Sequence, residues 1–116
     1  MTHWELINTE TRDGFEVRMY AAPEETSFNE GFWGDYDENG AETARAIEEG
    51  RLAWFMVKVA AYRLGIELGS DYLGGCAYES ASDFLDDLYY EDMAAAAISE
   101  ARQTLVGLAV IAEATR

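Results

Sequence analysis

The sequence is poor in the side chains from which most catalytic and metal sites are built. It has a single cysteine, Cys76, a single histidine, His3, and a single lysine. One cysteine cannot form an internal disulfide, which predicts a reducing compartment. His3 lies near the chain start and gives no obvious base for a nucleophile, and one cysteine with one histidine gives no support to a zinc site. We therefore expect Cys76 to be a small buried residue.

Long apolar runs and targeting segments are also missing. No charged start is followed by an apolar stretch and a small-residue cleavage site, so we expect no secretory signal. The apolar run from Leu52 to Leu64 is interrupted by Lys58 and Arg63 and is too short to cross a bilayer. No glycine loop with a following lysine is present to hold a phosphate. The sequence predicts a cytoplasmic protein that is not an enzyme and has no cofactor or metal.

Positive charge is scarce. Among 116 residues, 23 are acidic and 8 are basic, which gives a net charge of −15. Such a charge repels nucleic acid and anionic membranes, and it attracts basic protein surfaces. Three interpretations stay open: the charge serves a basic partner, it serves solubility, or it is a trait of an organism whose whole proteome is acidic. Because 49% of the residues are hydrophobic, we expect a folded chain with one domain and one core.

Two stretches near the N-terminus predict a β-hairpin. His3–Thr11 and Phe15–Ala22 flank a turn that contains Asp13-Gly14, and Asp-Gly between such stretches is a strong hairpin signal. Pro23 has no N–H to donate and ends the second strand. Alternation of apolar and polar residues predicts one buried face, made of Trp4, Leu6, Phe15, Val17 and Met19.

An acidic connector runs from Glu24 to Gly50. It carries nine carboxylates and one arginine, and glycines interrupt its first part. Ala41–Glu49 predicts a short helix, with Asn39 as its cap and Gly50 as its stop. We expect the aromatic residues of the connector to pack under the edge of the sheet, although they could instead be recognition anchors: Phe28, Phe32 and Trp33.

The connector also contains part of a calcium-binding pattern. Asp35-Tyr36-Asp37-Glu38-Asn39-Gly40 matches the opening D-x-D-x-N-G of a calcium loop, in which side-chain oxygens bind the ion. The pattern then fails, because its eighth position is Glu42 and its twelfth is Ala46, where a bidentate glutamate is needed. We interpret the segment as a turn with solvated carboxylates, and a weak calcium-binding module stays an alternative.

Arg51–Tyr78 is the longest apolar stretch and admits two interpretations. As a helix it would gather its apolar residues on one face and end at Gly65. As strands, Leu52–Tyr62 would be a central strand with two apolar faces, followed by a turn and a second strand over Ile66–Tyr78. Periodicity does not decide between them, because the valines and aromatic residues favour a strand and the alanines favour a helix.

A resemblance favours the strands. Gly65-Ile66-Glu67-Leu68-Gly69-Ser70-Asp71-Tyr72-Leu73-Gly74-Gly75-Cys76 resembles a stretch in small acidic proteins of bacterial phages and mobile elements, especially those of actinobacteria. There a valine-rich strand and a turn precede G-V-x-L-G-S-x-S-L-W-G, and a tyrosine-rich helix start follows, as at Tyr89–Leu105. This sequence has Tyr72 where serine is usual and lacks the tryptophan before Gly75. The resemblance, over Gly50–Leu105, implies a phage or mobile-element origin and a β-hairpin, and no activity.

The last third of the chain predicts one long helix over 80–114. Ser80 and Asp83 form a capping-box pattern, and acidic residues load the first half, where the helix dipole favours them. We therefore predict an α+β fold in a single domain over 1–116: an antiparallel sheet of three or four strands packed against this helix, with a short connector helix. The side of the helix that packs across the sheet is expected to be Phe84, Leu88, Ala95, Ile98, Leu105, Leu108 and Ile111 or Ala112.

The carboxylates of this helix are the main functional candidates. No basic residue occurs between Leu64 and Ala101. On a helix, Asp83, Asp87 and Glu91 would share one face and repeat about every 6 Å, close to the spacing of phosphates on a nucleic-acid strand. We predict an inhibitor that occupies the basic nucleic-acid site of a host defence complex, of the CRISPR or restriction type. Its partner-binding residues would be Asp83, Asp86, Asp87, Tyr89, Tyr90, Glu91 and Asp92, with a second patch at Asp35, Asp37 and Glu38.

Two alternatives to mimicry stay open for the same residues. A solvated helix face gives the same spacing of carboxylates with no partner at all. The helix with Tyr89 and Tyr90 could also serve as a protein–protein adaptor or a homodimer module that involves no mimicry.

Overall fold

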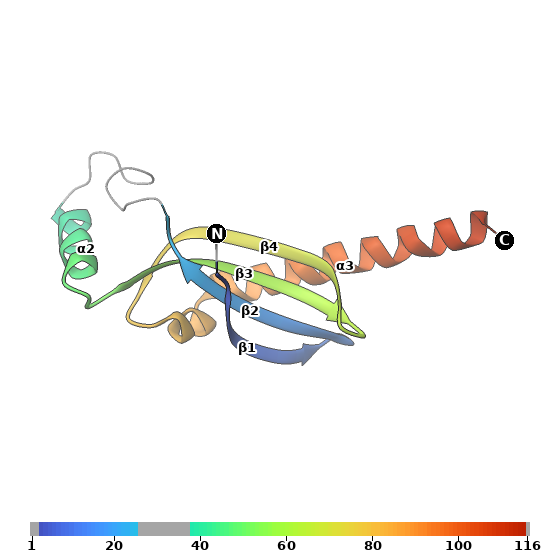
Figure 1. Cartoon of the computed structure of the whole chain (residues 1–116), viewed down its shortest axis with the longest axis horizontal. Helices are drawn as coiled ribbons and strands as arrows, with labels where there is room; N and C mark the ends of the chain where they lie inside the picture. Colours follow the sequence, from blue (N-terminus) through green and yellow to red (C-terminus); the bar gives the residue numbers. More distant parts are fainter. Residues whose placement is uncertain (1–2, 26–37, 116) are drawn as a thin grey trace.

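The computed structural model describes residues 3–25 and 38–115. Its strands form one antiparallel sheet in chain order, and the predicted α+β fold is confirmed (Figure 1). The stretch Arg51–Tyr78 forms strands and not a helix. The elements are β1 (Glu5–Arg12), β2 (Phe15–Pro23), α2 (Glu38–Glu48), β3 (Ala53–Arg63), β4 (Ile66–Tyr78), the 3₁₀ helix η1 (Ala81–Asp86) and α3 (Leu88–Ala114).

Both hairpins turn through two residues with positive φ. Asp13 and Gly14 have φ values of 54° and 83°, and Leu64 and Gly65 have φ values of 53° and 77°. These values fit type I′ turns, whose twist matches that of the flanking strands. The Asp-Gly hairpin prediction is confirmed. The second turn places a leucine where asparagine, aspartate or glycine is usual.

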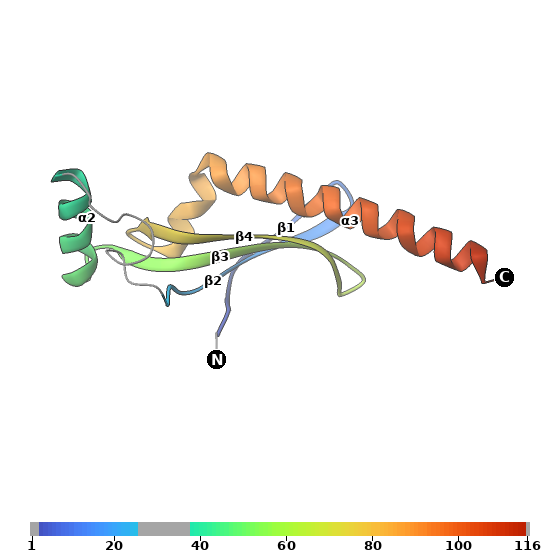
Figure 2. The same ribbon diagram turned by 90° about the horizontal axis from the view of Figure 1, so that it is seen from above.

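The helix α3 covers one face of the sheet (Figure 2). Gly69 of β4 lies so close to α3 that an added Cβ would stand 2.2 Å from the carbonyl oxygen of Ala97. This inner face holds the core, and the predicted burial of Phe15, Val17 and Met19 is confirmed. The other main core residues are Phe55, Val57, Val59, Phe84, Tyr90, Met93, Ala94, Ala97, Ile98 and Ala101.

The predicted places of Leu6 and Trp4 are wrong. The pairing of β1 with β2 shifts by one residue between Leu6 and Asn8, which is a β-bulge. Leu6 therefore lies exposed on the outer face, and Ile7 packs against the core in its place. Trp4 lies over the same outer face, with its ring centroid 6.1 Å from that of Tyr72. The alternation in the sequence contains no sign of the inserted residue.

The predicted single helix over 80–114 is interrupted near its start. The first turns form η1, and Asp87 has an extended backbone (φ −90°, ψ 149°) before α3 begins at Leu88. The cap at the start is confirmed, because the Ser80 N–H donates to the Asp83 carboxylate over 3.1 Å. The predicted helix is therefore two helices of different type, joined at an extended residue.

This break also changes which side of α3 packs on the sheet. Leu88 is 81% exposed and Ala95 is exposed, against the prediction. Ile98 is buried as expected, and Leu105 is half-buried against the core. Leu108 and Ile111 lie beyond the sheet and are exposed.

The molecule is elongated because α3 runs past the end of the sheet (Figure 2). Its extents are 61 × 27 × 25 Å and its radius of gyration is 17.3 Å. A compact domain of this length would have a radius of gyration of about 13 Å. The residues from 106 to 115 are exposed. We call this part of α3 the projecting end.

The connector helix α2 begins earlier than predicted and lies beyond the opposite end of the sheet (Figure 1). Asn39 lies inside α2, so its predicted role as a cap is wrong. The predicted stop is confirmed: Gly50 has a φ of 77°, and the Arg51 N–H donates to the Ala46 carbonyl over 2.9 Å. The predictions for other connector residues lie outside the described residues, namely those for Phe28, Phe32, Trp33, Asp35, Tyr36 and Asp37.

Candidate functional site

The predicted partner-binding residues of the C-terminal third gather at one end of the sheet, around η1 and the first turn of α3. We call this region the acidic end and define it by its exposed carboxylates, Glu79, Asp83, Asp86 and Asp92. Because Asp87 separates η1 from α3, these groups do not form the regular helical row that the spacing predicted. The acidic end therefore offers concentrated negative charge and not a copy of phosphate spacing.

Asp87 has a structural role within this region. Its carboxylate accepts the Tyr89 N–H over 3.1 Å and the Tyr78 hydroxyl over 2.6 Å. The bond from Tyr78 lowers the pKa of Asp87, and burial together with the same bond raises the pKa of Tyr78. Asp87 therefore caps α3 and ties it to β4.

Glu91 and Tyr90 hold α3 to β1. The Arg12 guanidinium donates to Glu91 over 2.7 Å and to Glu10 over 2.9 Å, and its bond to Glu91 lowers the pKa of that carboxyl. The buried Tyr90 donates its hydroxyl to Glu10. The prediction of Tyr90 as an aromatic anchor is wrong, because its ring lies in the core. Tyr89 is exposed, and its role as an aromatic anchor for a partner stays a prediction.

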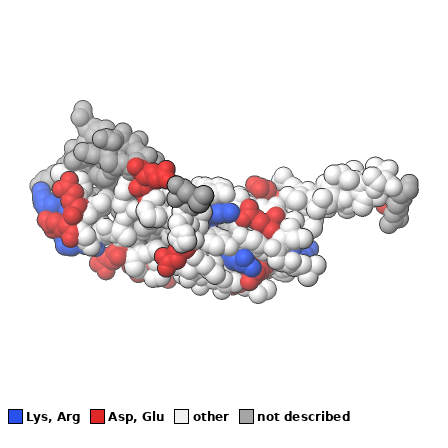
Figure 3. Space-filling model, viewed as in Figure 1, with Lys and Arg blue, Asp and Glu red and all other residues white. Residues whose placement is uncertain are grey.

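Basic side chains elsewhere in the structure are almost all neutralised. Figure 3 shows red and blue groups next to one another over α2 and over the sheet. No salt bridge joins Glu79, Asp83, Asp86 or Asp92 to a basic side chain within residues 3–25 and 38–115. The pairs outside the acidic end include Arg18–Glu16 (2.7 Å), Arg45–Glu42 (2.6 Å), Arg51–Glu49 (2.8 Å), Lys58–Glu67 (2.7 Å) and Arg102–Asp13 (3.6 Å).

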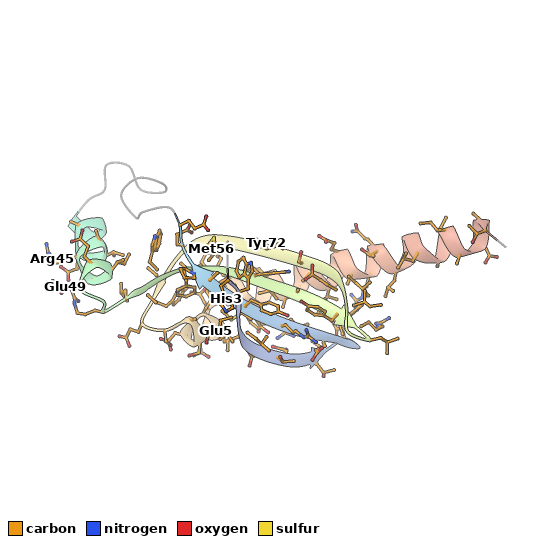
Figure 4. The ribbon with its side chains drawn as sticks, viewed as in Figure 1. His3, Glu5, Arg45, Glu49, Met56 and Tyr72 are labelled. Carbon is orange, nitrogen blue, oxygen red and sulfur yellow. The ribbon has the colours of Figure 1, made fainter. Side chains whose placement is uncertain are left out.

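The outer face of the sheet carries a second cluster that the sequence did not lead us to expect. Its tyrosines and cations come from alternate positions of neighbouring strands, and Figure 4 labels Tyr72 and Met56 on this face. The hydroxyls of Tyr20 and Tyr62 lie 2.9 Å apart, and the Arg18 guanidinium lies 4.1 Å from the centre of the Tyr62 ring. Because Arg18 and Lys58 both have carboxylate partners, this face has little net charge. The alternation of Arg18 and Tyr20 along β2 could have indicated this cluster on the outer face.

The described residues contain few side chains that are placed for catalysis or metal binding. Within them, no three His, Cys, Asp or Glu side chains are placed to hold a metal ion. Cys76 is buried as predicted, and burial raises the pKa of its thiol to about 11. An open hollow of about 490 Å³ lies between α2 and the chain after β4, lined by Glu42, Thr43, Ala46, Arg51, Leu52 and Glu79.

The helix α3 is long and apolar enough, by length and composition alone, to cross a membrane. Its first half is the core helix of the sheet, with Met93, Ala97 and Ala101 buried. Length and composition are weak evidence for a membrane span in a helix of this kind.

The chain matches no protein-family model, no curated protein and no solved structure.

Proposed function

We propose that this chain is a non-enzymatic binding protein whose acidic end occupies a basic, nucleic-acid-binding surface of a partner protein. One observation supports this proposal. The carboxylates Glu79, Asp83, Asp86 and Asp92 have no cationic partner in the described residues, whereas nearly every basic side chain there is paired elsewhere. Among the described residues, the acidic end therefore presents four carboxylates without a neutralising cation, in a chain whose net charge is −15.

The acidic end is held on a rigid support. Ser80 and Asp83 cap η1, Asp87 caps α3, and Arg12 bridges β1 to Glu91. Carboxylates on such a support lose little conformational entropy when they bind. Their field also speeds encounter with a basic surface and opposes direct binding to nucleic acid.

The proposed partner is a host defence complex of the CRISPR or restriction type. The resemblance of Gly65–Cys76 to phage and mobile-element proteins is the reason to search there first. Inhibition would follow from competition, because a site filled with carboxylates repels the phosphates of its normal ligand. Exposed Tyr89 would add an aromatic contact beside the charge.

The test uses two double variants with the same change in net charge. Asp86→Lys with Asp92→Lys alters the acidic end, and Glu48→Lys with Glu100→Lys alters exposed carboxylates away from it. We expect the first pair to weaken binding to a captured partner at least tenfold more than the second, since it places like charges in the interface. Wild-type affinity should also fall steeply between about 50 and 200 mM salt. Equal losses in the two variants, or retention that ignores salt, would rule the proposal out.

A further inference from the structure

β4 forms one edge of the sheet, and its last residues line a groove. The strand order β1-β2-β3-β4 leaves one side of β4 without a neighbouring strand among the described residues (Figure 1). A groove of about 400 Å³ is lined by the consecutive residues 73–78 of β4, together with Thr43 of α2 and Tyr89 of α3. Because successive side chains of a strand point to opposite faces, a groove that touches this whole run lies along the free edge. We call it the edge groove.

The backbone of Ala77 faces the edge groove. The Glu24 N–H donates to the Trp54 carbonyl over 3.2 Å, so Trp54 of β3 directs its backbone toward the chain after β2. Ala77 is the residue opposite Trp54 in the pairing of β3 with β4. Opposite residues of an antiparallel pair either exchange both backbone hydrogen bonds or direct these groups away from each other. The Ala77 N–H and carbonyl therefore face the groove, where no residue within 3–25 and 38–115 bonds them.

Other backbone groups of β4 have partners outside β3. The Leu68 carbonyl accepts the Thr104 hydroxyl over 2.9 Å. The Tyr72 N–H donates to the carboxylate of its neighbour Asp71 over 3.0 Å. Unpaired backbone groups on an edge strand are a template for another strand, and lysine or proline often blocks such an edge. The section of β4 around Ala77 has neither residue, so its edge is open to pairing.

Small residues in the edge groove give a second backbone room to approach. Gly74, Gly75 and Ala77 all line it, and glycine in a strand often marks a place where another backbone comes close. The Glu24 carboxylate accepts the Gly75 N–H over 2.7 Å and so holds this part of β4 in place. Tyr89, at the border of the groove, is 58% exposed and can contact the side chains of an incoming segment. The edge groove therefore has the features of a site for an added strand.

Charge favours a basic segment as the occupant. Thr43 lines both the edge groove and the hollow of about 490 Å³ beside it, and Glu79 lines that hollow directly after β4. Glu79 has no salt bridge in the part of the chain that the structure describes, and the Tyr89 ring can bind a cation on its face. A second copy of the chain would instead bring another net charge of −15 toward these groups. A strand that carries lysine or arginine complements them.

We propose that the edge groove binds an extended, basic segment of the partner protein, which pairs with β4 through the Ala77 N–H and carbonyl. This rests on the proposed function, because it specifies how the partner of the acidic end is held. Main-chain hydrogen bonds of the added strand supply affinity, and its basic side chains reach Glu79 and Tyr89 and supply specificity.

The probe is a fluorescein-labelled nine-residue peptide that alternates lysine and valine. Its binding to the whole chain is measured by fluorescence anisotropy up to about 1 mM protein, which covers weak complexes. The wild type should bind this peptide. Methylation of the peptide's backbone nitrogens removes its N–H donors and keeps its charge, and it should weaken binding at least tenfold. The same peptide with glutamate in place of lysine should not bind.

A proline variant places the peptide on β4. Ala77→Pro removes an N–H that faces the groove and not β3, so the fold should tolerate it, while binding of the basic peptide should fall about tenfold. The matched control is Ser70→Pro, on the same strand about 23 Å away at about 3.3 Å per residue, which should bind normally. Thermal denaturation checks that both variants fold, and if Ala77→Pro does not, the methylated peptide alone decides.

Four results would overturn the proposal: no binding of the basic peptide, equal binding of its methylated form, binding of the acidic peptide, or equal losses in the two proline variants. A wild-type dimer that Ala77→Pro dissociates would assign the edge groove to a second copy and overturn it as well. The Asp86→Lys, Asp92→Lys variant should still distinguish the methylated peptide from the unmethylated one. The edge groove and the proposed function of the acidic end therefore fail separately.

Discussion

At the scale of single residues, Gly69 decides how closely the sheet and α3 approach. Its neighbours are backbone atoms of α3, the Ala97 carbonyl oxygen and the Ala101 nitrogen, which would stand 2.2 and 2.6 Å from an added Cβ. Buried Ala97 and Ala101 present no larger side chain at this place. One glycine of the stretch Gly65–Cys76 therefore has a packing role.

Gly69→Ala should destabilise the protein by about 2 to 3 kcal/mol, because the helix or the strand must shift to admit the methyl group. Urea denaturation measures this loss. Ser70→Ala, at the next position on the outer face, adds no volume and should change the stability little. A Gly69→Ala variant as stable as the wild type would show that the approach of α3 to β4 is looser than described.

Asp87 provides a prediction about pH. Its folded-state pKa is lowered by the Tyr78 hydroxyl and the Tyr89 N–H, so its carboxylate stabilises the native state above the ordinary aspartate pKa of about 4. This contribution is lost as the pH falls through the lowered value. The wild type should therefore be more stable than Asp87→Asn at pH 7, and the difference should disappear toward pH 2.

The matched control for this comparison is Asp86→Asn, which removes the same charge but not the bond to Tyr78. Thermal denaturation of the three proteins from pH 2 to 7 gives the comparison. A gap between wild type and Asp87→Asn that stays constant with pH would contradict the role assigned to Asp87.

At the scale of elements, the two hairpin turns have the same geometry and different residues. Asp13-Gly14 suits a type I′ turn, and Leu64-Gly65 suits it poorly because a leucine with positive φ is strained. Leu64 is 95% exposed, so no packing compensates for the strain.

Leu64→Asn should stabilise the protein by about 1 kcal/mol, since asparagine adopts positive φ at a lower cost. Leu64→Ala removes the same exposed side chain without this advantage, so it should raise the free energy of unfolding much less. The free energy of unfolding in urea distinguishes the two variants. Equal gains would mean that removal of the exposed leucine, and not the turn geometry, is responsible.

An element could be predicted from the sequence when its local signals and its tertiary contacts favour the same structure. Asp13-Gly14 and the alternation after Phe15 placed β2 and its buried face, and Gly50 marked the end of α2. The bulge at Ile7 was hidden because an inserted residue leaves no local signal. The break at Asp87 depends on a hydroxyl from Tyr78 in another element, so the acidic row was predicted wrongly. The buried side of α3 was predicted only in part, at Ile98 and Leu105.

At the scale of the whole molecule, three surfaces differ in charge. The acidic end is strongly negative, the outer face of the sheet and α2 carry paired charges, and the projecting end of α3 is apolar. A net charge of −15 spread evenly would serve solubility alone. The group of carboxylates around η1 without a salt bridge in the described residues, Glu79, Asp83, Asp86 and Asp92, is the reason to assign the charge a partner.

The most direct test of that assignment is a competition experiment on the partner protein. Labelled nucleic acid is bound to the partner, and its release is followed as the wild-type chain is added. The account predicts release by the wild type and by the Glu48→Lys, Glu100→Lys variant, with little release by Asp86→Lys, Asp92→Lys. Simultaneous binding of the chain and the nucleic acid to the partner would contradict it.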